Sequence, residues 1–138
     1  RDPDIRPEKR LADFDADTIA EVLRINTTGP ALLAKHFLPL LRRDAKSAFA
    51  AISARVGSIS DNRLGGWHAY RTSKAALNMF TRSLAAELGT EGFTCIVLHP
   101  GWVKTDMGGA QAPLNVRESV EGMRRRVAKR GPAARAAG

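Results

Sequence analysis

The sequence predicts an α/β fold in which parallel strands alternate with amphipathic helices. Two short apolar runs, at residues 47–53 and 93–99, have the length and the flanking charges and glycines that are typical of buried parallel strands. Between them, apolar residues recur at helical spacing from Tyr70 onward. A strand, a helix and a second strand in this order make a βαβ unit, whose ligands bind beyond the carboxyl ends of the strands.

Length and composition limit the class of protein. With 138 residues, of which 43% are apolar, the chain is large enough for one globular domain. No apolar run is long enough to span a bilayer and no signal peptide is recognisable, so we expect a cytoplasmic protein that does not bind a membrane. The single cysteine, Cys95, cannot form an internal disulfide, and its apolar surroundings favour a buried strand residue over a reactive thiol.

The net charge of +8 is concentrated at one end of the chain. Residues 124–138 hold six of the 22 basic residues and no acid, whereas the rest of the chain, with its 14 acids, is nearly neutral. A basic segment of this kind can bind phosphate non-specifically, but no aromatic residue lies within it to stack on a base. We therefore favour a solvated, disordered segment over a nucleic-acid contact.

The opening of the chain, up to Thr18, is charged and lacks apolar periodicity, which predicts a loop. Asp15 or Asp17 can cap the helix that follows. Pro30 interrupts this helix because proline lacks the amide hydrogen of the helical ladder, so we expect a bend near residues 26–29. The apolar positions of the helix are Ile19, Val22, Leu23, Ile25, Leu32, Leu33, Phe37, Leu38 and Leu41.

Asn26 lies just before the expected bend. From the residue types alone, its amide would serve the backbone that Pro30 loosens.

The remaining segments follow in order. A polar turn at residues 42–44 leads to the first strand, and a turn-rich loop at residues 60–69 leads into the Tyr70 helix, which ends at Gly89. In that loop, His68 has no partner at triad or metal-ligand spacing, so we expect an exposed loop residue. Beyond the second strand, one more helix is indicated by Val116, Val120, Met123 and Val127.

Tyr70 and Lys74 are four residues apart, on one face of the predicted helix. A free phenol has a pKa of about 10, so a tyrosine that transfers protons at neutral pH needs a positive charge nearby to stabilise its phenolate. Lys74 is placed to supply that charge. Taken alone, the spacing favours a solvated pair, because the same two residues occur by chance on many helices.

The sequence around this pair is a more specific signal than the pair itself. The segment ISARVGSISDNRLGGWHAYRTSKAALNMFTRSLAAELG, followed by FTCIVLHPGWVKTDM, resembles the short-chain dehydrogenase/reductase superfamily. Within it, the likeness is greatest to sniffer-type carbonyl reductases and to C-factor, or C-signal, proteins. The resemblance covers about residues 13–125 and rests on YxxxK together with PGxVxT. It implies part of a Rossmann fold, a doubly wound parallel sheet, and NAD(P)-dependent reduction of a carbonyl.

The resemblance implies roles for three residues outside the strand ends. In the family, hydride passes between the nicotinamide and the substrate carbon, while the motif tyrosine, here Tyr70, gives or takes the proton on oxygen. Lys74 would lower the pKa of that tyrosine and bind the cofactor ribose. Asn26 matches an asparagine whose local helix distortion holds a water that links to the lysine.

The PGxVxT motif implies a second group of cofactor contacts. In the family it grips the nicotinamide carboxamide through the backbone at Val103 and the hydroxyl of Thr105. The motif residues present in this chain are Pro100, Gly101, Val103 and Thr105.

The family's substrate-binding serine is the residue that this chain lacks. At the end of the first strand, the position of that serine is occupied by Ala54. Ser53 precedes it and Ser58 follows it, but strand alternation points Ser53 away from the side of residue 54. We include Ser53 in the predicted catalytic set, although both serines also fit a structural role.

A Rossmann domain begins with a strand that leads into a glycine-rich turn, because only glycine lets the backbone approach the pyrophosphate. Neither GxxxGxG nor GxGxxG occurs here, and no apolar strand precedes Leu11. We therefore expect a truncated copy, with the carboxyl-terminal part of a Rossmann domain at residues 1–131 and a disordered tail at 132–138.

The expected cofactor is NADP or NAD, and the expected substrate is a small carbonyl compound or alcohol, without a metal. In the family, the helices that correspond to those beginning near Asp17 and Tyr70 commonly form a dimer interface, so we expect a homo-oligomer. The alternative is a non-catalytic fragment that acts as a dimerising or C-signal-like signalling module. The missing glycine turn and Ala54 motivate that alternative.

Overall fold

The structure, a computed structural model, describes residues 7–41 and 47–129. These residues form two compact units. The first unit holds the described residues within 1–40 and 55–80, and the second holds those within 41–54 and 81–138. Helix α3, His68–Leu88, contributes its first part to the first unit and its remainder to the second.

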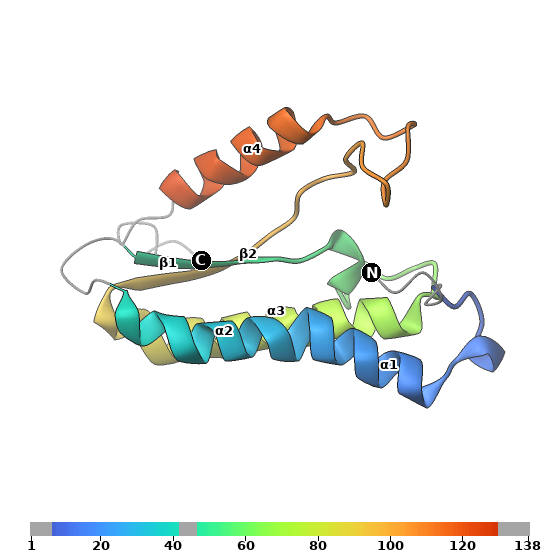
Figure 1. The fold of residues 1–138 in the computed structure, drawn as a ribbon, viewed down its shortest axis with the longest axis horizontal. Helices are drawn as coiled ribbons and strands as arrows, with labels where there is room; N and C mark the ends of the chain where they lie inside the picture. The colour runs from blue at the N-terminus through green and yellow to red at the C-terminus, as the bar shows by residue number, and fades with distance from the viewer. Residues whose placement is uncertain (1–6, 42–46, 130–138) are drawn as a thin grey trace. The chain divides into compact units, whose positions relative to one another are not determined.

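In the first unit, one long helical run is built from three segments. Helix α1 (Ala16–Leu23) continues through a π-helical segment (Arg24–Thr28) into α2 (Gly29–Phe37), as Figure 1 shows in blue to cyan. Asp15 caps the run, since its Oδ2 accepts a hydrogen bond from the Thr18 amide at 2.7 Å. This confirms the first of the two predicted caps. Short 3₁₀ turns flank the run at Leu11–Asp13 and Leu38–Leu40.

The π-helical segment lies where the sequence predicts a bend. The amide of residue 30 would donate to the Asn26 carbonyl in a regular α-helix, and Pro30 has no such hydrogen. The ladder therefore widens, and the Gly29 amide bonds to the carbonyl of Arg24, five residues earlier. Pro30 itself is accommodated in the first turn of α2, where an amide is not needed.

Helix α3 begins after three consecutive residues in the left-handed region. Gly65, Gly66 and Trp67 have φ values of 65°, 63° and 52°. For Trp67 this conformation is strained, because its Cβ crowds the carbonyl oxygen that follows. The first helical residue, His68, is half-buried and meets Phe14 edge to face, with ring centroids 6.3 Å apart. The prediction of an exposed loop histidine is therefore wrong, because the helix begins two residues before Tyr70.

The second unit contains the sheet. Strands β1 (Ser47–Ile52) and β2 (Phe93–Leu98) pair in parallel, in register from Ser47 opposite Phe93 to Ile52 opposite Leu98. The predicted parallel strands are confirmed. Prediction of a buried first strand is only half right, because alternate positions of β1 are exposed, including Ile52 at 55%. Cys95 lies in β2 as expected but is half-buried.

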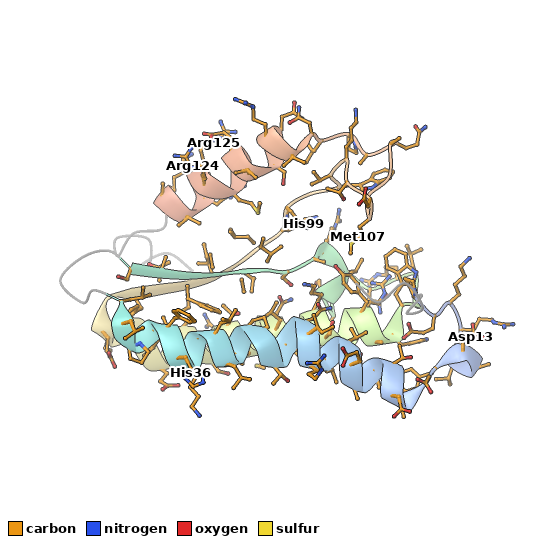
Figure 2. The ribbon with its side chains drawn as sticks, in the orientation of Figure 1. Asp13, His36, His99, Met107, Arg124 and Arg125 are labelled. Carbon is orange, nitrogen blue, oxygen red and sulfur yellow. The ribbon has the colours of Figure 1, made fainter. Side chains whose placement is uncertain are left out.

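Helix α4, Val116–Lys129, is capped by a reciprocal pair. The Glu118 amide donates to Asn115 Oδ1 at 2.9 Å, and the Asn115 amide donates to Glu118 Oε2 at 2.8 Å. Arg124 and Arg125 project from this helix (Figure 2). The expectation of disorder from residue 124 onward is therefore wrong as far as Lys129, since the helical apolar spacing continues to Val127. The predicted tail at 132–138 and the predicted turn at 42–44 lie outside the described residues.

Each unit has its own buried residues. Those of the first unit include Ala34, Leu38, Ala69, Ser73 and Leu77. Those of the second include Ala51, Ser53, Thr81, Phe93, Ile96, Ala112 and Ser119. Within residues 7–41 and 47–129, no helix has the length and apolar character needed to cross a membrane.

Candidate active site

The predicted site residues fall into two groups, one in each unit. In the first unit, Tyr70 and Lys74 lie on the first turns of α3, as the spacing predicts. The ammonium Nζ of Lys74 lies 5.7 Å from the centroid of the Tyr70 ring, within cation–π distance. Both side chains are about half buried. The pair is therefore in contact rather than spread over a solvated surface.

Burial changes the proton affinity of both groups. It raises the pKa of the Tyr70 phenol above its ordinary value of 10.0, because the phenolate loses hydration. It lowers the pKa of Lys74 below 10.5 for the corresponding reason, the loss of hydration around the ammonium. In this structure, burial thus opposes the lowering of the Tyr70 pKa that the resemblance implies.

A spectroscopic titration tests this balance directly, because Tyr70 is the only tyrosine in the chain. We expect tyrosinate absorbance to rise with a midpoint above 10.0 in the folded chain and at 10.0 in the urea-unfolded chain. The stability linked to Tyr70 is then present below pH 10.0 and is lost as the pH rises toward the folded-state value. A folded midpoint below that of the unfolded chain would show that the charge of Lys74 outweighs burial.

Asn26 is tied to α3 through a buried serine that the sequence did not single out. The Asn26 amide Nδ2 donates to Ser73 Oγ at 3.1 Å, and Ser73 Oγ donates to the Tyr70 carbonyl at 2.8 Å. Thr27 adds a third bond, from its hydroxyl to the Ser73 carbonyl at 2.9 Å. Ser73 has no solvent-exposed surface, so these bonds cannot be exchanged for water. The irregular segment around Asn26 is therefore fixed against the residue between Tyr70 and Lys74.

Gly57 explains how the chain after β1 comes close to α3. A Cβ atom at Gly57 would lie 2.7 Å from Lys74 Cβ and 2.9 Å from the Lys74 carbonyl carbon. Only glycine permits this approach, which the 3₁₀ turn Arg55–Gly57 makes against the helix at the predicted catalytic lysine. Asn78 bonds the same turn, with its amide donating to the Gly57 carbonyl at 3.4 Å.

Arg71 ties down the loop that precedes α3. Its guanidinium donates to the Gly66 carbonyl from Nε at 3.0 Å and to the Val56 carbonyl from Nη1 at 3.2 Å. One side chain thus joins the two ends of the loop that carries Ser58. Ser58 itself takes part in a local turn, where its Oγ accepts from the Asp61 amide at 3.3 Å. This is the structural role that the sequence left open for Ser58.

The second group lies at the carboxyl ends of the two strands. The Ser53 amide donates to the Leu98 carbonyl at 2.8 Å, which extends the parallel ladder by one residue past β1. Ser53 and Pro100 therefore follow directly from neighbouring strands at one edge of the sheet, as the βαβ prediction requires. Ser53 is buried, at 5% exposure, whereas Ala54 is half-buried. Its catalytic role stays a prediction.

The PGxVxT segment forms a compact turn. Thr105 Oγ1 accepts a hydrogen bond from the Gly108 amide at 3.1 Å, and the Lys104 amide donates to the Leu114 carbonyl at 2.8 Å. Gly108 lies so close to the Val103 carbonyl that no side chain fits there. Gly101 has a φ of 85°, which favours glycine. The motif is thus held as a preformed loop, with the Thr105 side chain exposed.

No group of three or more His, Cys, Asp or Glu side chains is placed to hold a metal ion within the part of the chain that the structure describes.

Comparison with known proteins decides the family. The chain matches a family model described as "Enoyl-(Acyl carrier protein) reductase" over residues 4–137. It is 47% identical over 115 residues to the C-signal protein of Myxococcus xanthus, covering 83% of this chain and 69% of that protein. This chain belongs to the short-chain dehydrogenase/reductase family. The prediction from YxxxK and PGxVxT is confirmed.

Solved structures of this family support the fold. The carbonyl reductase Sniffer of D. melanogaster superposes with a TM-score of 0.86 at 38% identity, over 93% of this chain and 56% of that protein. An NADPH-bound carbonyl reductase from chicken fatty liver gives a TM-score of 0.82 at 38% identity, over 94% of this chain and 56% of that protein. The chain thus spans about half the length of these short-chain reductases and has part of their Rossmann fold. An NADP or NAD cofactor is consistent with these relatives.

Proposed function

We propose that this chain carries the catalytic half of an NAD(P)-dependent carbonyl reductase. The observation that carries the proposal is the contact between Tyr70 and Lys74 on the first turns of α3. The Asn26 segment is tied to the same turns through Ser73. Membership of a family of oxidoreductases supports this reading.

Each unit has donors of the kind that a nicotinamide nucleotide requires. In the first, the Lys74 ammonium can donate to ribose hydroxyls. In the second, the loop around Pro100 and Gly101 presents the exposed Thr105 hydroxyl and the Val103 backbone, which suit the nicotinamide amide. When bound, the reduced nicotinamide supplies a hydride to the carbonyl carbon of the substrate.

In this mechanism Tyr70 manages the proton. As the carbonyl is reduced, negative charge develops on the substrate oxygen, and the Tyr70 hydroxyl donates its proton to that atom. The half-buried Lys74 ammonium then stabilises the phenolate that remains on Tyr70. Asn26 would hold the water through which the proton is replaced. Ser53, at the end of β1, stays the candidate for the substrate-binding hydroxyl that Ala54 lacks.

Cofactor binding by the purified chain tests this proposal. We expect NADPH or NADH to bind saturably, followed by nicotinamide fluorescence, and Lys74→Ala to weaken binding about tenfold or more, since a charged hydrogen-bond donor is lost. Lys35→Ala is the matched control, because Lys35 is exposed on α2 and should leave binding unchanged. Absence of binding at millimolar cofactor, or equal loss in both variants, would contradict the proposal.

A second function is a dimerising or signalling module without catalysis. Two observations favour it, the likeness to the C-signal protein and the exposed apolar side chains of the α1–α2 run. Leu33 and Phe37 are each 58% exposed there, which suits an interface between copies of the chain. The cofactor titration, combined with sedimentation of the purified chain, distinguishes the two functions. A chain that sediments as a dimer but binds no nicotinamide nucleotide fits only the module.

A further inference from the structure

Glu8 lies outside every motif, yet it contacts the start of the helix that carries Tyr70. Its carboxylate Oε1 accepts a hydrogen bond from the Ala69 amide, and its backbone carbonyl accepts one from the Trp67 amide at 2.7 Å. Glu8 is half-buried, and Ala69 is 3% exposed. One residue thus makes two bonds, across about 60 positions of sequence, to the residues immediately before Tyr70.

These bonds supply a cap that α3 lacks in its own sequence. A helix leaves its first amides without internal partners, and Ser, Thr, Asp or Asn at the cap position commonly accepts from one of them. The residue before α3 is Trp67, whose side chain has no acceptor atom. The Glu8 carboxylate takes that place, and a negative charge at a helix amino terminus is favourable.

The neighbouring segment reinforces the same contact. A Cβ atom at Gly66 would come within 3.1 Å of the Lys9 carbonyl, so the Glu8–Lys9 backbone packs directly on the left-handed turn. On the other side, Arg71 holds the Gly66 carbonyl at 3.0 Å. The strained Trp67 conformation is therefore fixed from both sides, which is how a residue keeps a φ of 52°.

We propose that Glu8 is a positioning residue for Tyr70, which fixes the first turn of α3 by capping it from a distant part of the chain. The inference rests on the proposed function for its catalytic consequence, whereas the structural contact stands without it. Loss of the cap lets the first turn fray and lets water reach the Tyr70 phenol. Reach rather than charge should decide the effect, because the acceptor oxygen must lie at the Ala69 amide.

Three variants separate reach from charge. Glu8→Gln keeps the length and an acceptor oxygen but loses the charge, Glu8→Asp keeps the charge but is one methylene shorter, and Glu8→Ala loses both. The matched control is Asp13→Ala, an acid of the adjacent 3₁₀ turn labelled in Figure 2. Asp13 forms an ion pair with exposed Arg10 at 3.1 Å, and a surface pair of this kind contributes little.

Two readouts apply to the purified chain without any turnover. We expect amide exchange at Ala69 and Tyr70 to rise about tenfold in Glu8→Ala and Glu8→Asp, and to stay within about twofold of the original in Glu8→Gln and Asp13→Ala. The tyrosinate midpoint of Tyr70 should fall toward 10.0 in Glu8→Ala and Glu8→Asp only. Where a form of the protein reduces a carbonyl, the same two variants should lower kcat and leave the KM for the cofactor unchanged.

Either of two results would overturn the inference. The first is an unchanged Tyr70 midpoint and unchanged exchange in both Glu8→Asp and Glu8→Ala. The second is a larger effect of Glu8→Gln than of Glu8→Asp, which would assign the contact to charge alone. If Glu8→Ala does not fold, the Gln and Asp variants still decide. A chain that binds no cofactor but shows the expected exchange pattern contradicts only the proposed function.

Discussion

Replacing Tyr70 with Phe should abolish carbonyl reduction in any form of this protein that turns over. The substitution removes one hydroxyl and keeps the ring over which the Lys74 ammonium lies. Loss of a positioned general acid lowers rates by about 10²- to 10⁴-fold, so kcat should fall at least about a hundredfold. Cofactor oxidation with a carbonyl substrate measures the rate, and cofactor affinity measured in parallel should change little.

The control for this variant is His68→Gln. His68 is the titratable residue nearest to Tyr70 in sequence on its amino side, and its ring packs edge to face on Phe14. A proton donor at His68 would make the Gln variant as inactive as Tyr70→Phe, whereas we expect it to retain most of the rate. Near-normal turnover in Tyr70→Phe would rule the mechanism out.

Replacing Gly57 with Ala should cause the largest loss of stability of any substitution proposed here. The new Cβ would lie 2.7 Å from Lys74 Cβ and 2.9 Å from the Lys74 carbonyl carbon, which belongs to the helix backbone and cannot rotate away. Relief requires the Arg55–Gly57 turn to move off α3, and overpacking of this kind costs about 1–3 kcal/mol. Urea unfolding of the purified chain measures the free energy of unfolding.

Gly122→Ala is the matched control for that result. Gly122 lies inside α4, and a Cβ atom there would meet nothing within 4 Å. Alanine is favoured over glycine within a helix, so we expect this variant to gain about 0.5–1 kcal/mol. A Gly57→Ala chain as stable as the original would mean that the turn does not pack on Lys74 in solution.

The sequence was informative wherever a residue type has a local consequence. The two apolar runs predicted parallel strands that the structure contains, and Pro30 predicted the irregular helix at Asn26 because a missing amide hydrogen must disturb the ladder at that point. The motif around Tyr70 predicted the family. These features act over a few residues, so periodicity and spacing are sufficient to find them.

Contacts between residues far apart in the sequence could not be predicted from periodicity and spacing. Ser73 bonds to Asn26 and Thr27, and Glu8 bonds to Ala69, but neither serine nor glutamate carries a local signal of such a partner. The prediction that β1 is buried failed for a similar reason. The apolar run of β1 predicted a strand covered on both faces, whereas exposure depends on what lies above and below the strand, and Ile52 is open at 55%.

The bonds at Ser73 also bear on how the site forms during folding. They join positions 46 and 47 residues apart, so the chain between them must close into a loop before Asn26 meets the Tyr70 turn. Helix α3 can form on its own within microseconds, with Tyr70 and Lys74 already at their spacing. Attachment of Asn26 waits for the slower, non-local event, since contacts of long sequence separation govern folding rates. An isolated α3 peptide would therefore contain the motif without the arrangement that makes it a site.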